Sequence, residues 1–330
     1  MGEREIKKGE SYYKNRELTI GAALLLVALS PLKLIMGTLP PYEMIDYSAP
    51  ISFVSNYIQQ EYPIVATILG MVLIIYSARR VSNAAHRMHL YERSNNLPFI
   101  MMVITTLSIL SSQYYLTTAL TATFATAALD LTLSSYQNSN QNDTLFGAGF
   151  TLGLLPLLYP PAIILMPMMV LTIVLFSRTL RESIIYTIGI IIPFTALMYI
   201  NWLAGFKVIT LIDGFIFTIT HEIGFYIKSI DNYITWALIS LFALLILLSV
   251  VFMGQITDRR RAKFRLFYIF IWLGVALFSL HIGASNSTFI AIAAPAAATL
   301  MPITLLSIDE KYSKYVYYLV LILALLGVVM

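Results

Sequence analysis

Long apolar runs follow one another from Leu18 to the C-terminal Met330, separated by short polar segments. A helix of about 20 apolar residues crosses the hydrocarbon core of a bilayer and satisfies its own backbone hydrogen bonds there. The pattern therefore predicts an all-α fold, a polytopic transmembrane helical bundle with about 11 membrane helices. The runs are 18–39, 63–81, 98–113, 115–133, 146–158, 160–177, 183–203, 234–253, 265–283, 287–306 and 314–330.

The same pattern divides the chain into a polar tail, residues 1–17, and a single integral membrane domain, residues 18–330. The first apolar run exceeds the usual length of a signal-peptide core and lacks a small-residue cleavage site, so we interpret it as a retained anchor. Two longer segments, 40–62 and 204–233, are predicted to connect membrane helices on the outside. Within the second, isoleucines recur at spacings of three and four, which predicts an amphipathic helix over 213–230 at the membrane interface.

The central apolar runs are short. As a helix, residues 146–158 would extend only about 20 Å, and the Tyr159-Pro160-Pro161 sequence then turns the chain. If longer helices surround these short hairpins, the hairpins form the bottom of a cavity that opens outward. The alternative is that no cavity exists and the bilayer is locally thinner around the short helices. Gly147, Gly149 and Gly153 follow no strand, so their spacing indicates helix packing rather than a phosphate-binding loop.

Charge gives these helices an orientation. Of the 330 residues, 58% are hydrophobic and 12% are charged, against about 25% charged in soluble domains. Alternate polar segments hold 18 of the 21 lysines and arginines, which places the N-terminus in the cytoplasm and the C-terminus outside. The net charge of +4 is thus a topology signal and does not indicate nucleic-acid binding. The chain has no cysteine, which excludes disulfides and thiol chemistry.

Three candidate chemical residues lie near the first outside segment. Glu43 and Asp46 would share one face of a helix, where either could act as a general base or bind a metal. The alternative is a pair of solvated loop acids. Lys33 could contact a substrate phosphate, or its ammonium could extend to the outer surface from within the first helix.

Four further residues are secondary candidates. His221 and Glu222 form either an acid–base pair or a plain polar helix face. His281 could bind phosphate or donate a proton, or it could be a hydrogen-bonded structural histidine. Asp130 is the clearest intramembrane carboxylate, but the predicted topology puts it near the inside surface, where a helix–helix contact is the alternative. No metal-ligand cluster, nucleotide-binding motif or nucleophile triad is evident, and no cofactor is identified.

Residues Thr144 to Gly205 resemble the central part of an uncharacterised family of Bacteroidota integral membrane proteins. The resemblance is carried by LFGAGFTLGLLPLLYPPA, by SRTLRE and by the run from Gly189 to Pro193. It implies a location in the bacterial inner membrane and brings no established activity.

The same stretch more loosely resembles multipass glycosyltransferases that use polyprenyl-phosphate sugars. It shares with them a G-x-x-x-G-L run, a short hairpin, a basic inside turn and a helix with proline. The resemblance implies a glycosyltransferase-C-like architecture and a catalytic acid in the first outside loop, where Asp46 and Glu43 lie. That loop is short here, its acids are not adjacent, and the large outside C-terminal domain of many such enzymes is missing.

These observations favour transfer of a sugar from a polyprenyl-phosphate-linked donor to a cell-envelope acceptor at the outer face of the inner membrane. Asp46, or else Glu43, would deprotonate the acceptor, while Lys33 and His281 would hold the donor phosphate. The alternatives are a non-catalytic component of an envelope-assembly complex, which would bind protein partners, and a transporter of a lipid-linked or small substrate. Membrane lipids are partners in every case.

Overall fold

The computed structural model describes residues 50–91, 96–107, 115–136, 142–203, 233–256, 260–278 and 286–329, together with 21, 22, 24, 205, 212, 213 and 216. Within these residues every regular element is helical, which confirms the all-α prediction for this part of the chain. The elements are α4 (Pro50–Glu61), α5 (Pro63–Arg87), α6 (Leu97–Thr106), α7 (Tyr115–Ser135), α8 (Asn142–Leu158), the 3₁₀ helix η2 (Pro160–Leu165), α9 (Pro167–Leu175), α10 (Leu180–Leu203), α12 (Tyr233–Ile256), α13 (Arg260–Phe278), α14 (Asn286–Ser307) and α15 (Glu310–Val329).

Several of these helices have the length and composition of membrane spans. Four of the described helical segments are long and apolar enough to cross a bilayer: Pro63–Arg87, Tyr115–Ser135, Leu180–Leu203 and Ile290–Ser307. The outward faces of α5 and α10 expose large apolar side chains such as Ile64, Ile68, Ile188 and Ile191. So many exposed large apolar side chains are unusual on a soluble monomer but suit contact with lipid. The fold therefore supports a helical membrane protein.

Helix α14 occupies the middle of one half of the bundle, where it contacts α5, α6, α7, α12, α13 and α15. Pro295 and Pro302 lie inside it, and each leaves a carbonyl one turn earlier without its helical donor. Trp272 Nε1 donates to the carbonyl of Ile292 at 3.1 Å, and the buried Tyr91 hydroxyl donates to that of Thr299. Each of these carbonyls lies one residue after the carbonyl that loses its donor to proline. Burial raises the pKa of the Tyr91 phenol above its ordinary value. These donors tie the proline-containing helix to its neighbours.

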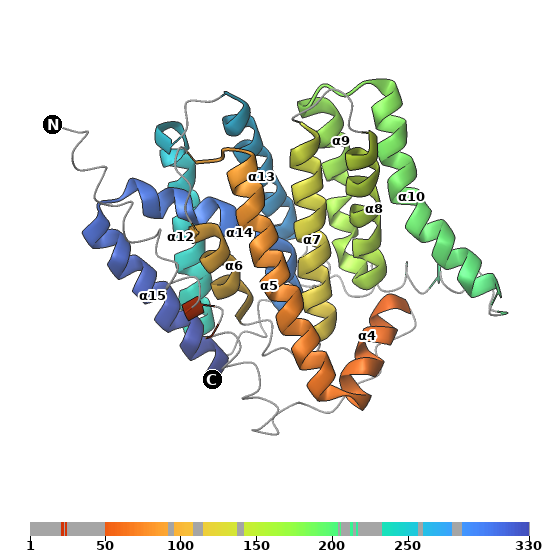
Figure 1. The fold of residues 1–330 in the computed structure, drawn as a ribbon, viewed down its shortest axis with the longest axis horizontal. Coiled ribbons are helices and arrows are strands. Elements are labelled where there is room, and N and C mark those ends of the chain that lie inside the picture. The colour runs from red at the N-terminus through yellow and green to blue at the C-terminus, as the bar shows by residue number, and fades with distance from the viewer. Residues whose placement is uncertain are drawn as a thin grey trace.

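The other half of the bundle is built on close contact between α8 and α10, seen side by side in Figure 1. A Cβ atom added to Gly189 would lie 2.6 Å from the carbonyl oxygen of Phe146, and one added to Gly153 would lie 3.0 Å from Ile190 Cα. Gly149 similarly faces the backbone of Tyr186. Small residues let helix backbones approach closely, so the interpretation of Gly149 and Gly153 as packing residues is confirmed. At Gly147 an added Cβ would meet only Leu131 Cδ1, at 3.4 Å, so the interpretation does not extend to it.

The predicted short hairpin is also present. Helix α8 ends at Leu158, Tyr159 is extended, and η2 and α9 return the chain. In Figure 1 the lower ends of α8 and α9 lie well above the lower end of α5. Helix α4 contacts the end of α8 and also packs on α5 and α7, although the sequence pattern had placed residues 50–61 in a connecting segment.

Candidate functional site

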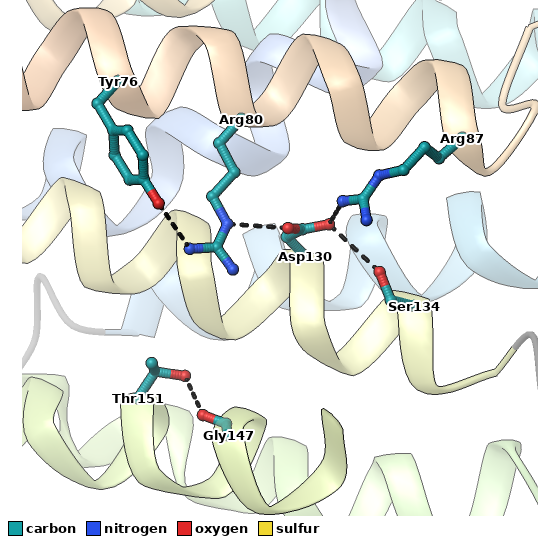
Figure 2. Close-up of polar contacts among 7 residues, drawn as sticks. All are labelled: Tyr76, Arg80, Arg87, Asp130, Ser134, Gly147 and Thr151. Atoms are coloured by element: carbon teal, nitrogen blue, oxygen red, sulfur yellow. Dashed lines mark hydrogen bonds and ion pairs between the residues drawn. The ribbon is translucent and has the colours of Figure 1, made fainter. Parts of the chain in front are cut away.

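A buried carboxylate, Asp130, joins α5 and α7 near the end at which both helices terminate (Figure 2). Its Oδ2 accepts a hydrogen bond from Arg80 Nε and its Oδ1 accepts one from Arg87 Nη2, both at 2.8 Å. The Ser134 hydroxyl donates to Oδ1 at 3.3 Å. The side chain of Asp130 is 6% exposed, against 22% for Arg80 and 56% for Arg87. The carboxylate is enclosed while both guanidinium groups extend toward the surface.

The local sequence explains this arrangement. Arg80 and Arg87 are seven residues apart, so they lie on one face of α5, which is the face toward α7. Removing a carboxylate from water is costly unless it is paired and hydrogen-bonded, and Asp130 has three donors. Arg80 Nη1 also donates to the Tyr76 hydroxyl at 3.3 Å. Both carboxylate oxygens are occupied by donors of the protein, so the geometry is that of a helix–helix contact with an excess of positive charge.

Polar contacts continue along the rest of the interface between α5 and α7. Ser77 Oγ donates to Thr123 Oγ1 at 3.0 Å, and the hydroxyls of Thr67 and Tyr115 lie 3.1 Å apart. Along this interface, later residues of α5 pair with later residues of α7, so the two helices run parallel. Neutral hydroxyl pairs thus lead from the start of the two helices to the Asp130 ion pairs near their ends.

A second polar cluster lies where α4 packs on the start of α7, at the end of the bundle predicted to face outward. Ser55 Oγ and Thr117 Oγ1 are 2.5 Å apart, and Thr117 Oγ1 donates to Asn56 Oδ1 at 2.8 Å. The Gln59 amide oxygen accepts from the backbone N–H of Leu116 at 3.2 Å. Asn56 is 1% exposed, and its Nδ2 has no hydrogen-bond partner among the described residues. The cluster is neutral and fixes α4 across the first turn of α7.

The opposite end, where α5, α7 and α9 terminate, gathers buried arginines, and we call it the basic end. Arg178 Nη2 donates to the carbonyl and the hydroxyl of Ser135, and its Nη1 lies 3.6 Å from Glu182 Oε2. Arg265, in the second turn of α13, donates from Nη1 to the carbonyl of Met88 at 2.9 Å. These contacts bring the ends of α5 and α7 together with the start of α13.

Of the seven candidate residues, the structure describes Asp130 alone. Asp46, Glu43, Lys33, His281, His221 and Glu222 lie outside the described residues, so their convergence stays a prediction. The partners of Asp130 were missed because Arg79, Arg80 and Arg87 served as topology markers. The seven-residue spacing of Arg80 and Arg87 was a signal that both face one neighbour. The described residues contain no group of three or more His, Asp or Glu side chains that could hold a metal ion.

The comparisons with known proteins add no family assignment. No family model matches the chain, and neither the curated proteins nor the solved structures gave a match.

Proposed function

We propose that the protein is an eleven-helix protein of the bacterial inner membrane, with its N-terminus in the cytoplasm and its C-terminus outside. Four described helices have the length and composition of spans, and Leu97–Thr106, Ala162–Leu175 and Ala243–Phe252 are shorter apolar segments. The arginines of the described part gather at the basic end through Arg80, Arg178 and Arg265, as the positive-inside rule expects of a cytoplasmic face. The α4 end would then face outward.

We further propose that it transfers a sugar from a polyprenyl-phosphate-linked donor to a cell-envelope acceptor at that outward end, within a glycosyltransferase-C-like architecture. One observation carries the proposal. The hairpin of α8, η2 and α9 ends short of the outward end of α5, and α4 packs against its apex. Helix α4 begins at Pro50, only four residues after Asp46 in the sequence. This short separation in sequence supports the proposal that the candidate acid acts at the outward end, beside the hairpin.

In the proposed reaction one proton is removed, one bond to the anomeric carbon forms and one breaks. Asp46, with Glu43 as the second candidate, removes the proton of an acceptor hydroxyl, whose oxygen attacks the anomeric carbon of the donor. The bond from that carbon to the phosphate oxygen breaks, and polyprenyl phosphate leaves. Lys33 and His281 stabilise the negative charge of the leaving phosphate. Asp130 takes no part, because it lies toward the opposite end of the bundle.

Purified protein in liposomes tests this function. Liposomes loaded with polyprenyl-phosphate donors carrying different sugars are mixed with envelope glycan acceptors, and released polyprenyl phosphate is measured by mass spectrometry. Loss of a general base costs about 10²–10⁴ in rate, so Asp46→Asn should lower turnover at least a hundredfold. Glu61→Gln is the matched control, since Glu61 is an exposed acid at the far end of α4.

Two results together would assign the chain to the non-catalytic class instead. They are absence of transfer from every donor, and full complementation of a deletion strain by both Asp46→Asn and Glu43→Gln. The protein would then act as a component of an envelope-assembly complex.

A further inference from the structure

Arg265 carries an unused pair of hydrogen-bond donors inside the basic end. The residue is 3% exposed, and within the described part of the chain its Nε and Nη2 atoms are buried without a hydrogen-bond partner. Its Nη1 is occupied by the carbonyl of Met88. Nε and Nη2 share one edge of the guanidinium, the edge whose parallel N–H groups bind a carboxylate or phosphate in bidentate fashion. The two Arg265 donors best placed to bind an oxyanion are therefore the two without a partner among the described residues.

Positive charge is in excess around this edge. Within the described part of the chain, the buried Asp130 pairs with two arginines and Glu182 pairs with Arg178, while Asp143 and Asp309 are exposed. Arg178 also has a buried Nε without a partner among the described residues. Arg261, one turn before Arg265 on α13, is exposed, so water screens its charge. A buried cation is costly unless an anion compensates it.

Aromatic rings hold the two buried arginines in place. The Cζ atom of Arg265 lies 5.5 Å from the centroid of the Tyr136 ring, and that of Arg178 lies 5.9 Å from that of Phe176. These two rings are themselves 4.6 Å apart, and Phe176 is 5.4 Å from Tyr268. Cation–π contacts at this distance favour a fixed guanidinium position. The donors of Arg265 are therefore preorganised before any anion arrives.

We propose that the basic end contains a phosphate-binding site in which the Nε and Nη2 atoms of Arg265 bind two phosphate oxygens, with Arg178 supplying further positive charge. The phosphate belongs either to the headgroup of an anionic lipid or to a soluble phosphate compound, which offer the same oxygens. Arg265 lies about 7.5 Å along α13 from its start, a depth that headgroups reach from the cytoplasmic surface. The site is independent of sugar transfer, which we place at the opposite end.

Delipidated protein in detergent provides the test, with the thermal unfolding midpoint measured against phosphatidylglycerol, phosphatidylcholine and inorganic phosphate. A molecule that binds the folded state raises this midpoint in a saturable way. The site predicts such a rise with phosphatidylglycerol, or with inorganic phosphate if the natural source is soluble. The apparent affinity should fall at least tenfold in Arg265→Gln. It should fall by less in Arg265→Lys, which keeps the charge but loses the bidentate edge.

Arg261→Gln is the matched control, because it removes an equal charge from the exposed neighbour. Its affinity should stay within about twofold of the wild type, a difference of about 0.4 kcal/mol. Equal losses in Arg261→Gln and Arg265→Gln would show diffuse surface attraction and overturn the site. Native mass spectrometry of the wild type needs no variant, and a failure to retain or acquire any phosphate-bearing molecule would also overturn it. Glu92 and Asp258 lie outside the described residues but close in sequence to Met88 and to the start of α13. If no phosphate-bearing molecule is bound, and Glu92→Gln or Asp258→Asn lowers the unfolding midpoint as much as Arg265→Gln does, the edge binds a carboxylate of the chain instead.

Discussion

Two pairs of neighbouring helices in this bundle associate by different means. Helices α5 and α7 are joined by polar side chains, from the Thr67–Tyr115 and Ser77–Thr123 hydroxyl pairs to the ion pairs of Asp130. Helices α8 and α10 are joined by backbone contact, with Gly149 and Gly153 set against Tyr186 and Ile190. The first interface is held by hydrogen bonds and ion pairs, whereas the second is held by close backbone packing that only glycine permits.

The difference reflects where each pair lies. Helix α7 is enclosed by α5, α8 and α14, so its polar groups need partners inside the protein. Helix α10 is exposed over most of its surface, and lipid offers little gain for burying its apolar side chains against another helix. Close packing at glycine is then the main source of attraction. Substitutions at the two interfaces should therefore destabilise the protein for different physical reasons.

The largest effect is expected from Asp130→Asn, which leaves two guanidinium groups without an anion. Breaking a buried ion pair costs about 3–5 kcal/mol, and the partial exposure of Arg80 and Arg87 favours the lower end of that range. The measurement is the thermal unfolding midpoint of the purified protein in detergent. Asp309→Asn is the control, because Asp309 is exposed. Adding Arg80→Gln to Asp130→Asn should cost less than the two single losses combined, and simple additivity would refute the ion-pair interpretation.

The next largest effect is expected at the glycine interface. In Gly153→Ala and Gly189→Ala the new methyl group meets backbone rather than a mobile side chain, so the helices must separate. Overpacking of this kind costs about 1–3 kcal/mol. Gly147→Ala is the matched control on the same helix, since its Cβ would lie 3.4 Å from Leu131 Cδ1, an ordinary contact. Equal unfolding midpoints for Gly147→Ala and Gly153→Ala would contradict the proposed role of backbone contact.

The smallest effect is expected from Thr123→Val, which removes one neutral hydroxyl from the α5–α7 interface at nearly constant volume. Hydrogen bonds between membrane helices contribute about 0.6 kcal/mol on average. Ser77 Oγ keeps its second bond, to the carbonyl of Leu73 at 2.7 Å, so no donor is stranded. A loss as large as that of Asp130→Asn, measured in the same unfolding assay, would show that the neutral contacts matter as much as the ion pairs.

The sequence predicted helices well where apolar residues alone define them. The run 115–133 became Tyr115–Ser135, and the turn at Tyr159-Pro160-Pro161 lies where proline requires it. The run 63–81 ended too early, because α5 continues through Arg87. The apolar run stops at Arg79 and Arg80. The helix nevertheless continues, because Asp130 on α7 provides an anion for Arg80 and Arg87.

Helix α4 was missed for a related reason. Its apolar residues Val54 and Tyr57 are exposed, while the polar Ser55 and Asn56 are buried against α7. This is the reverse of the pattern that identifies an amphipathic helix in water. The environment of Arg265 was equally hidden, because a base near a predicted helix end looks like a topology marker. Burial by segments distant in sequence, such as Met88 and Tyr136, decides its chemistry.

The membrane sides of the two bundle ends are tested most directly by thiol labelling, which the absence of native cysteine makes simple. Glu61, at the α4 end, and Asp143, at the start of α8, are both exposed and are therefore suitable sites. A membrane-impermeant maleimide should label Glu61→Cys in intact cells, and should label Asp143→Cys only after permeabilisation. Labelling of Asp143→Cys in intact cells, with protection of Glu61→Cys, would contradict the account by placing the basic end outside.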